Sequence, residues 1–77
     1  MARALVLVNA TPGKDRAVAR RLKQVRGVSG VCLVSGLYDV VGEVAGRTQD
    51  EIINLVYDRV RTIPGVTGSH TMFCVNA

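Results

Sequence analysis

The spacing of apolar residues changes several times along the chain. Short, nearly continuous apolar runs predict β-strands at residues 4–10, 31–35, 40–45 and 71–75. After the first run, Val18, Leu22 and Val25 recur at the i, i+4, i+7 spacing of one helical face. After the third run, apolar residues again recur at helical spacing, at Ile52, Val56, Val60 and Ile63. The pattern predicts the order strand, helix, strand, strand, helix, strand.

Turn and capping residues bound the two predicted helices. In the first, we expect Thr11 to cap the helix with Pro12 at its first position, and Gly27 to end it in the left-handed conformation. The second follows the capping box TQDE at residues 48–51 and stops at Pro64, which is followed by glycine.

The two halves of the chain resemble each other. The sequence RGVSGV at residues 26–31 follows the first predicted helix, and PGVTGS at residues 64–69 follows the second. Each half therefore consists of a strand, a helix, a Gly-Val-x-Gly turn and a strand, and such crossovers are nearly always right-handed. The sequence predicts a single domain, residues 1–77, with an α+β, ferredoxin-like βαββαβ fold and a four-stranded antiparallel sheet.

Alternation along the strands places apolar side chains on both faces of this sheet. In the first strand, Leu5 and Leu7 point away from Ala4, Val6 and Val8. Two helices can cover only one face, so the other would expose a large apolar patch. Burial of each large apolar side chain is worth about 1.5–3 kcal/mol. We therefore expect an obligate oligomer built on a two-fold dimer.

The net charge of +4 is concentrated in one segment. Six of the ten basic residues lie on or next to the first predicted helix: Lys14, Arg16, Arg20, Arg21, Lys23 and Arg26. Two interpretations are open, a solvated helix face or a patch that binds nucleic acid or an acidic partner. An RNA-recognition motif is excluded, because it stacks bases on aromatic residues of its central strands, and residues 4–10 and 40–45 contain none.

The sequence shows no membrane or secretion signal. No apolar run approaches the roughly 20 residues of a membrane span, and the N-terminus lacks a signal-peptide pattern. Cys32 and Cys74 lie in predicted strands at opposite sheet edges without CxxC spacing. We expect them to be small buried residues of a cytoplasmic protein, too far apart for a disulfide.

The chemistry of catalysis and of metal binding has little support in the sequence. Asp39 and Glu43 are four residues apart on one strand, roughly 13 Å, too far for paired-carboxylate catalysis. His70 is the sole histidine, so no histidine pair can hold a metal. We predict no metal and no cofactor, and we interpret His70 as structural or pocket-lining, with a chemical role left open.

The tight connection Gly-Leu-Tyr-Asp at residues 36–39 is the strongest candidate site. Gly36 allows backbone N–H groups to approach a ligand, and amides in a tight turn suit a carboxylate. Asp39 suits an ammonium group, and Tyr38 offers a ring and a hydroxyl. Together these groups match a free amino acid, although an ordinary turn could have the same sequence.

Two longer motifs extend this interpretation over essentially the whole chain. They are SGLYDVVGEV at residues 35–44 and IPGVTGSHT at residues 63–71. In both, the chain resembles the effector-binding (RAM) domain of the Lrp/AsnC, or feast/famine, family of transcription regulators. The resemblance implies a sheet-to-sheet dimer, an αβ sandwich of the dimeric α+β barrel type. It also implies rings of dimers, with a free amino acid bound at an interface between dimers.

The resemblance also implies the ligand-binding residues. Those that match the family's turn and hydroxyl positions are Gly36, Leu37, Tyr38, Asp39, Ser69 and Thr71. Asp39 would bind the ammonium group. Full-length members carry an N-terminal helix-turn-helix, whereas this chain begins at the first strand. It is therefore similar to stand-alone versions of the domain, for which we expect no direct sequence-specific DNA binding.

Three hypotheses for function follow. The first is an oligomeric amino-acid sensor that modulates transcription or metabolism, including by association with full-length Lrp/AsnC-type regulators. The second is a small enzyme of the dimeric α+β barrel type that uses His70. The third is a structural assembly partner with an empty turn.

Overall fold

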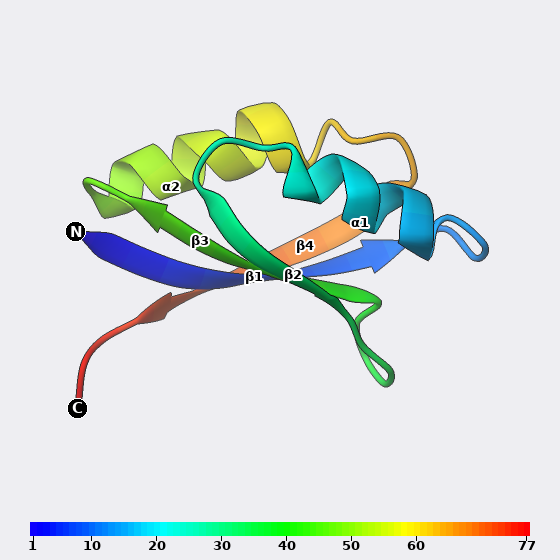
Figure 1. Cartoon of the computed structure of the whole chain (residues 1–77), viewed down its shortest axis with the longest axis horizontal. Helices are drawn as coiled ribbons and strands as arrows, with labels where there is room; N and C mark the ends of the chain where they lie inside the picture. The colour runs from blue at the N-terminus through cyan, green and yellow to red at the C-terminus, as the bar shows by residue number, and fades with distance from the viewer.

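The predicted order of elements is confirmed, and the strands form one sheet with both helices on the same face (Figure 1). The computed structural model describes residues 1–77. The elements are β1 (Ala2–Ala10), α1 (Asp15–Lys23), β2 (Val28–Leu33), β3 (Val40–Gly46), α2 (Gln49–Leu55), the π-helix η1 (Val56–Val60) and β4 (Val66–Cys74). This is the predicted α+β, ferredoxin-like arrangement.

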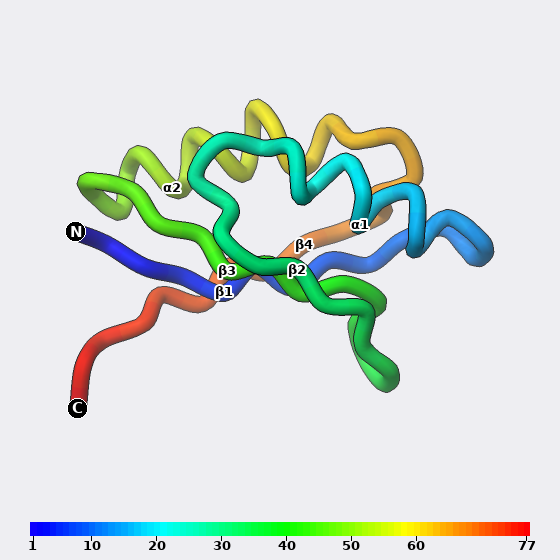
Figure 2. Tube along the Cα trace, viewed as in Figure 1, coloured from blue at the N-terminus to red at the C-terminus, as the bar shows by residue number.

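The sheet is antiparallel, with the strand order β2-β3-β1-β4. The central strand β1 pairs with both β3 and β4, so that Val6 lies opposite Gly42 on one side and Thr71 on the other. In the trace of Figure 2 the helices lie above the sheet, and the β2–β3 connection projects below it. That connection contains residues 36–39.

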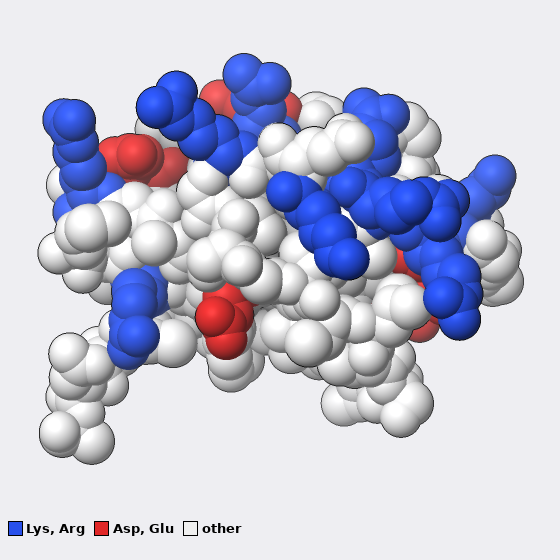
Figure 3. Space-filling view, in the orientation of Figure 1, with Lys and Arg blue, Asp and Glu red and all other residues white.

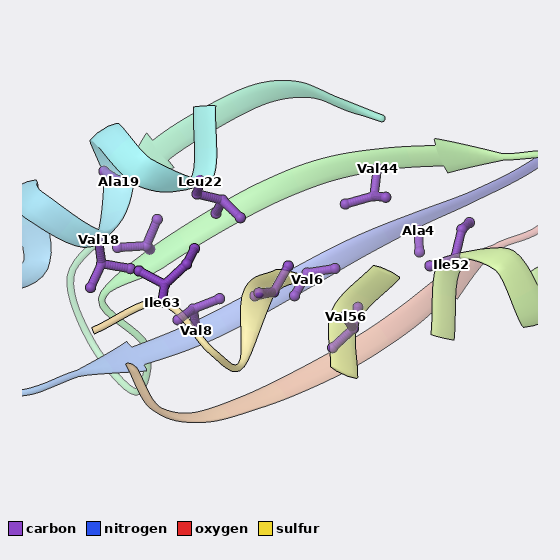
Figure 4. Packing of buried hydrophobic residues seen from close by; sticks show 12 residues of the cluster. Ala4, Val6, Val8, Val18, Ala19, Leu22, Val44, Ile52, Val56 and Ile63 are labelled. Atoms are coloured by element: carbon purple, nitrogen blue, oxygen red, sulfur yellow. The ribbon is translucent and has the colours of Figure 1, made fainter. Parts of the chain in front are cut away.

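The hydrophobic core lies between the helices and one face of the sheet (Figure 4). Its twelve buried residues are Ala4, Val6, Val8, Val18, Ala19, Leu22, Val40, Val44, Ile52, Val56, Val60 and Ile63. The predicted alternation in β1 is confirmed, because Leu5 and Leu7 are only half-buried. Gly42 allows α1 to approach β3, since a Cβ there would lie 3.1 Å from Leu22 Cδ2.

The start of α1 differs from the prediction. Thr11 and Pro12 lie in a turn, in which the Thr11 carbonyl accepts a hydrogen bond from the N–H of Lys14 (2.9 Å). The helix begins at Asp15, with Lys14 at the N-cap and no capping side chain. Thr11 has a different role, because its N–H donates to the Gly65 carbonyl (2.8 Å) and so joins this loop to the segment before β4.

The two Gly-Val-x-Gly sequences adopt the same backbone conformation at their first glycine. Gly27 and Gly65 both have a φ of 99°. The expected helix cap at Gly27 is wrong in position, since α1 ends with Gln24 as its C-cap. Gly27 instead shapes the turn into β2, where a Cβ would lie 3.0 Å from Leu55 Cδ1.

The second helix follows its predicted signals. Thr48 Oγ1 accepts a hydrogen bond from the Glu51 N–H (3.1 Å), and Glu51 Oε2 accepts one from the Arg47 N–H (3.2 Å). The last turns widen into η1, where the Arg61 N–H donates to the Val56 carbonyl (2.9 Å). No helix of the protein is long and apolar enough to span a membrane.

Three strands begin earlier than predicted, β1 at Ala2 and the other two well before their expected starts. β2 begins at Val28 and β4 at Val66, so both Gly-Val-x-Gly sequences enter the sheet. The pairing shifts register between Val28 and Gly30, and again opposite Asn9 and Ala10 of β1. Glycine at such irregular positions interrupts the apolar pattern by which a strand is recognised.

The expected burial of the two cysteines is wrong. Cys32 and Cys74 are free and exposed, although they do lie on opposite edge strands as predicted. Cys32 pairs with Val41, and Cys74 pairs with Arg3. Both pairs lie on the sheet face that no helix covers, and this explains the exposure.

Candidate functional site

The tip of the β2–β3 connection is open to solvent. Gly36 has a φ of 114°, a conformation that favours glycine, and a Cβ added there would meet nothing within 4 Å. Leu37 is 87% exposed. The connection closes where the Val34 N–H donates to the Asp39 carbonyl (3.0 Å). In the 36–39 turn (Gly36, Leu37, Tyr38 and Asp39), the tip at Gly36 and Leu37 is therefore accessible to a ligand.

Asp39 joins this turn to the end of β1. Its carboxylate Oδ2 accepts a hydrogen bond from the Ala10 N–H (2.7 Å), and its own N–H donates to the Val8 carbonyl (3.0 Å). The first of these bonds was not predicted from the sequence. A carboxylate has two oxygens and about four acceptor positions, so Asp39 Oδ1 is a further acceptor for a ligand.

Tyr38 lies against His70 of β4. The Tyr38 hydroxyl and His70 Nδ1 form a hydrogen bond of 3.1 Å, in which the donor depends on the imidazole tautomer. The two rings meet edge to face, with centroids 5.6 Å apart and an interplanar angle of 79°. His70 thus borders the candidate site, and its neighbour is a phenol and not a carboxylate. The 32 positions between the two residues give no sequence signal for this contact.

Ser69 and Thr71 lie on the other face of the sheet from His70. They pair with Val8 and Val6, and directly opposed residues of an antiparallel pair share a face. Both valines are fully buried under the helices. Ser69 and Thr71 are half-buried on one face of the edge strand β4.

The predicted ligand-binding residues form two groups within one chain. Asp39 bonds to β1 from the β3 side, whereas Ser69 pairs with β1 from the β4 side. Two strand spacings separate the groups, about 10 Å. Two hollows of the surface, of about 840 and 460 Å³, are lined by none of these residues. A single chain thus presents the groups without enclosing them.

The sheet face without helices carries an apolar band. One row across the four strands consists of His70, Leu7, Val41 and Cys32. The next row consists of Met72, Leu5, Glu43 and Gly30. Met72 is 53% exposed, and the branched side chains of both rows are half-buried. Exposed Glu43 and His70 interrupt this band, whose largest apolar members are Leu5, Leu7, Val41 and Met72. Large exposed apolar patches are typical of interaction sites.

No group of three or more His, Cys, Asp or Glu residues could hold a metal ion.

Comparisons with known proteins identify the family of the chain. The Lrp/AsnC ligand-binding domain matches residues 3–77. The HTH-type transcriptional regulator FL11 of Pyrococcus horikoshii is 35% identical over 69 residues, which are 90% of this chain and 45% of that regulator. The chain thus spans less than half the length of this relative.

Solved structures share the whole fold. TTHA0845 from Thermus thermophilus is 25% identical with a TM-score of 0.93, over 100% of this chain and 96% of that chain. The transcriptional regulator NMB0573 of Neisseria meningitidis, solved as a complex with L-Met, has a TM-score of 0.86 at 16% identity, over 97% of this chain and 50% of that chain. The chain belongs to the Lrp/AsnC family, whose ligand-binding domain extends over residues 3–77.

Proposed function

We propose that this protein is an oligomeric regulatory module that binds a free amino acid at a site between subunits. Binding would modulate transcription or metabolism, through association with full-length regulators of the same family. The observation that carries the proposal is the 36–39 turn, which presents accessible amides beside the Asp39 carboxylate.

The turn has complementary groups for both charges of an amino acid. Backbone N–H groups at the glycine-containing tip suit the ligand's carboxylate. Asp39 Oδ1 suits its ammonium group, through a charge-assisted hydrogen bond. Asp39 is fixed through Oδ2 to Ala10, so the second oxygen is held in one orientation and costs little further ordering on binding.

A second chain would complete the site. In Figure 2 the β2–β3 connection projects on the side of the sheet that the helices leave free. Packing of that face against the same face of a second copy buries the band of Leu5, Leu7, Val41 and Met72, at about 1.5–3 kcal/mol for each large side chain. The turn would then extend beyond its own sheet towards a neighbouring chain. Ser69 and Thr71 lie on the opposite face of the sheet, so a chain of a neighbouring dimer, and not the sheet-to-sheet partner, would supply these hydroxyls for the ligand's remaining polar groups.

The relatives support the class of ligand and of function. FL11 is a transcriptional regulator, and NMB0573 was solved with an amino acid, L-Met. A role other than catalysis is supported by the surroundings of His70, which is exposed and pairs with a tyrosine hydroxyl. A histidine that acts as a base is normally oriented by a carboxylate or activates a nearby nucleophile.

A thermal-shift screen of the proteinogenic amino acids tests this proposal. A ligand that binds only the folded protein stabilises it by about 2.7 kcal/mol at 100 times its Kd. We expect one amino acid, or one chemical class, to raise the melting temperature of the wild type. Asp39→Asn should abolish the shift, because it removes the charge while its carbonyl oxygen can still accept from Ala10.

Asp58→Asn is the matched control, since it removes one exposed carboxylate from η1, away from the turn. It should respond to the ligand as the wild type does. A wild type that responds to no amino acid would contradict the sensor proposal and favour a structural assembly partner. An equal loss of response in both variants would show that net charge, and not the turn, governs the shift.

A further inference from the structure

We propose that α1 presents a second binding surface, which contacts the phosphate backbone of duplex nucleic acid without sequence specificity. The surface is the basic face, defined by Lys14, Arg16, Arg20, Arg21, Lys23 and Arg26, all of which are exposed. Figure 3 shows Lys and Arg side chains gathered over α1. The inference does not depend on amino-acid binding at the 36–39 turn.

Helix stability does not explain this charge pattern. Cations near a helix C-terminus are favourable, which accounts for Arg20, Arg21 and Lys23 in the last turn of α1. Lys14 and Arg16 lie at the N-terminus, where the helix dipole opposes positive charge. Arg16 and Arg20 also form a like-charge pair at i, i+4, which is destabilising.

Exposure to solvent does not explain the charge pattern of α1 either, because the second helix is also exposed and carries charges of both signs. α2 and η1 face the same solvent from the same layer, yet carry Asp50, Glu51 and Asp58 together with Arg59. On α1 the single acid is Asp15. The second helix shows that this fold does not require an all-basic helix surface. We therefore attribute the nearly all-basic surface of α1 to an anionic partner.

The chemistry of α1 favours a duplex over other anionic partners. Its apolar stripe of Val18, Ala19 and Leu22 is buried in the core, so no apolar face is left to insert into a lipid surface. The sequence of α1, DRAVARRLK, contains no aromatic residue on which single-stranded bases could stack. Arg and Lys side chains bind phosphates irrespective of base sequence, so we assign its contacts to the phosphate backbone.

The dimensions of the basic face fit a nucleic-acid backbone. Arg16 and Lys23 are separated by about 10 Å along the helix, at about 1.5 Å per residue. Phosphates of one strand recur at about 3.4 Å along the duplex axis, so about three phosphates fall within this span. The basic face lies on the helix side of the sheet, so that packing of the opposite, apolar face against a second copy leaves it accessible.

Fluorescence anisotropy with short labelled DNA duplexes of two unrelated sequences tests the proposal, at about 50 mM and about 200 mM salt. We expect both duplexes to bind alike, with a Kd between about 10⁻⁶ and 10⁻⁴ M at the higher salt. With three phosphates neutralised, affinity should fall about 40-fold between the two salt concentrations. The triple variant R16Q/R20Q/K23Q should lose this binding at both salt concentrations.

The matched control is R47Q/R59Q/R61Q, which removes the same charge from residues outside the basic face. It should retain affinity within about threefold of the wild type. Gln and Arg have similar helix propensity, so the α1 variant should melt no lower than the wild type, and loss of binding can be separated from loss of fold. Equal loss in both triple variants would overturn the proposal. Absence of binding by the wild type at the lower salt would also overturn it, as would binding to phosphatidylserine vesicles or to poly-Glu without binding to the duplexes.

Discussion

The carboxylate of Asp39 accepts a hydrogen bond of 2.7 Å from the backbone N–H of Ala10, at the C-terminal end of β1. This bond gives Asp39 a structural role beside the ligand-binding role that we propose. It satisfies a backbone donor just beyond the last β1–β3 pair, Val8 with Val40, where β3 no longer supplies a partner. The position of the turn and the end of the central strand are therefore coupled.

Replacement of Asp39 by Ala should destabilise the fold even without a ligand. It leaves the part-buried Ala10 N–H without this acceptor, at a cost of about 1–3 kcal/mol. A domain of this size loses about 4–8 °C of melting temperature per kcal/mol. Asp39→Asn should lose much less. Thermal unfolding of the two variants beside the wild type measures the difference, and equal melting temperatures for both would argue against the structural role.

The hydrogen bond between Tyr38 and His70 should contribute a measurable coupling energy. The bond is exposed, so we expect about 0.5–1.5 kcal/mol. A double-mutant cycle of Tyr38→Phe and His70→Ala isolates it, because Phe keeps the edge-to-face ring contact and loses only the hydroxyl. The cycle is measured as the free energy of unfolding in urea of the wild type, the two single variants and the double variant. Additive effects of the two substitutions would mean that the bond is not populated in solution.

The local signals in the sequence were sufficient for the fold but not for the contacts of the site. The capping box and the apolar spacing in α2 involve residues within one or two turns, and the Thr48–Glu51 bond confirms them. Asp39 and Ala10 are 29 positions apart, and they meet because the β1–β3 register pairs Val8 with Val40 and so places Asp39 beside the end of β1. This register depends on the pairing of whole strands, which local residue patterns do not determine.

Exposure was misjudged for a related reason. Cys32 lies in an apolar run, which is typical of a strand buried on both faces. In a sheet with helices on one side only, alternate residues of that run face solvent. The exposure of Cys32 and Cys74 thus follows from their position on the face that no helix covers.

Substitution of Gly42 by Ala should reduce stability. The new Cβ would lie 3.1 Å from Leu22 Cδ2, a side chain that is fully buried and held on several sides. Overpacking of this kind costs about 1–3 kcal/mol. Gly68→Ala is the control in β4, since its Cβ would meet nothing within 4 Å. Urea denaturation should show a lower midpoint only for Gly42→Ala, and a similar loss in both would attribute the effect to strand glycine in general.

Substitution of Leu7 by Lys should produce a folded monomer. Leu7 lies in the middle of the row formed by His70, Val41 and Cys32, so a dimer through this face would bury the new ammonium group against apolar residues. Burial of an unpaired charge costs far more free energy than burial of the leucine side chain contributes. In a monomer, by contrast, the lysine remains in water. Sedimentation at increasing concentration should show dimer or larger species for the wild type and monomer for the variant. Ile53→Lys is the matched control, because Ile53 is an exposed apolar residue of α2 on the opposite side of the molecule. If Leu7→Lys assembles as the wild type does, the sheet face is not the interface, and the site between subunits must be formed by other surfaces.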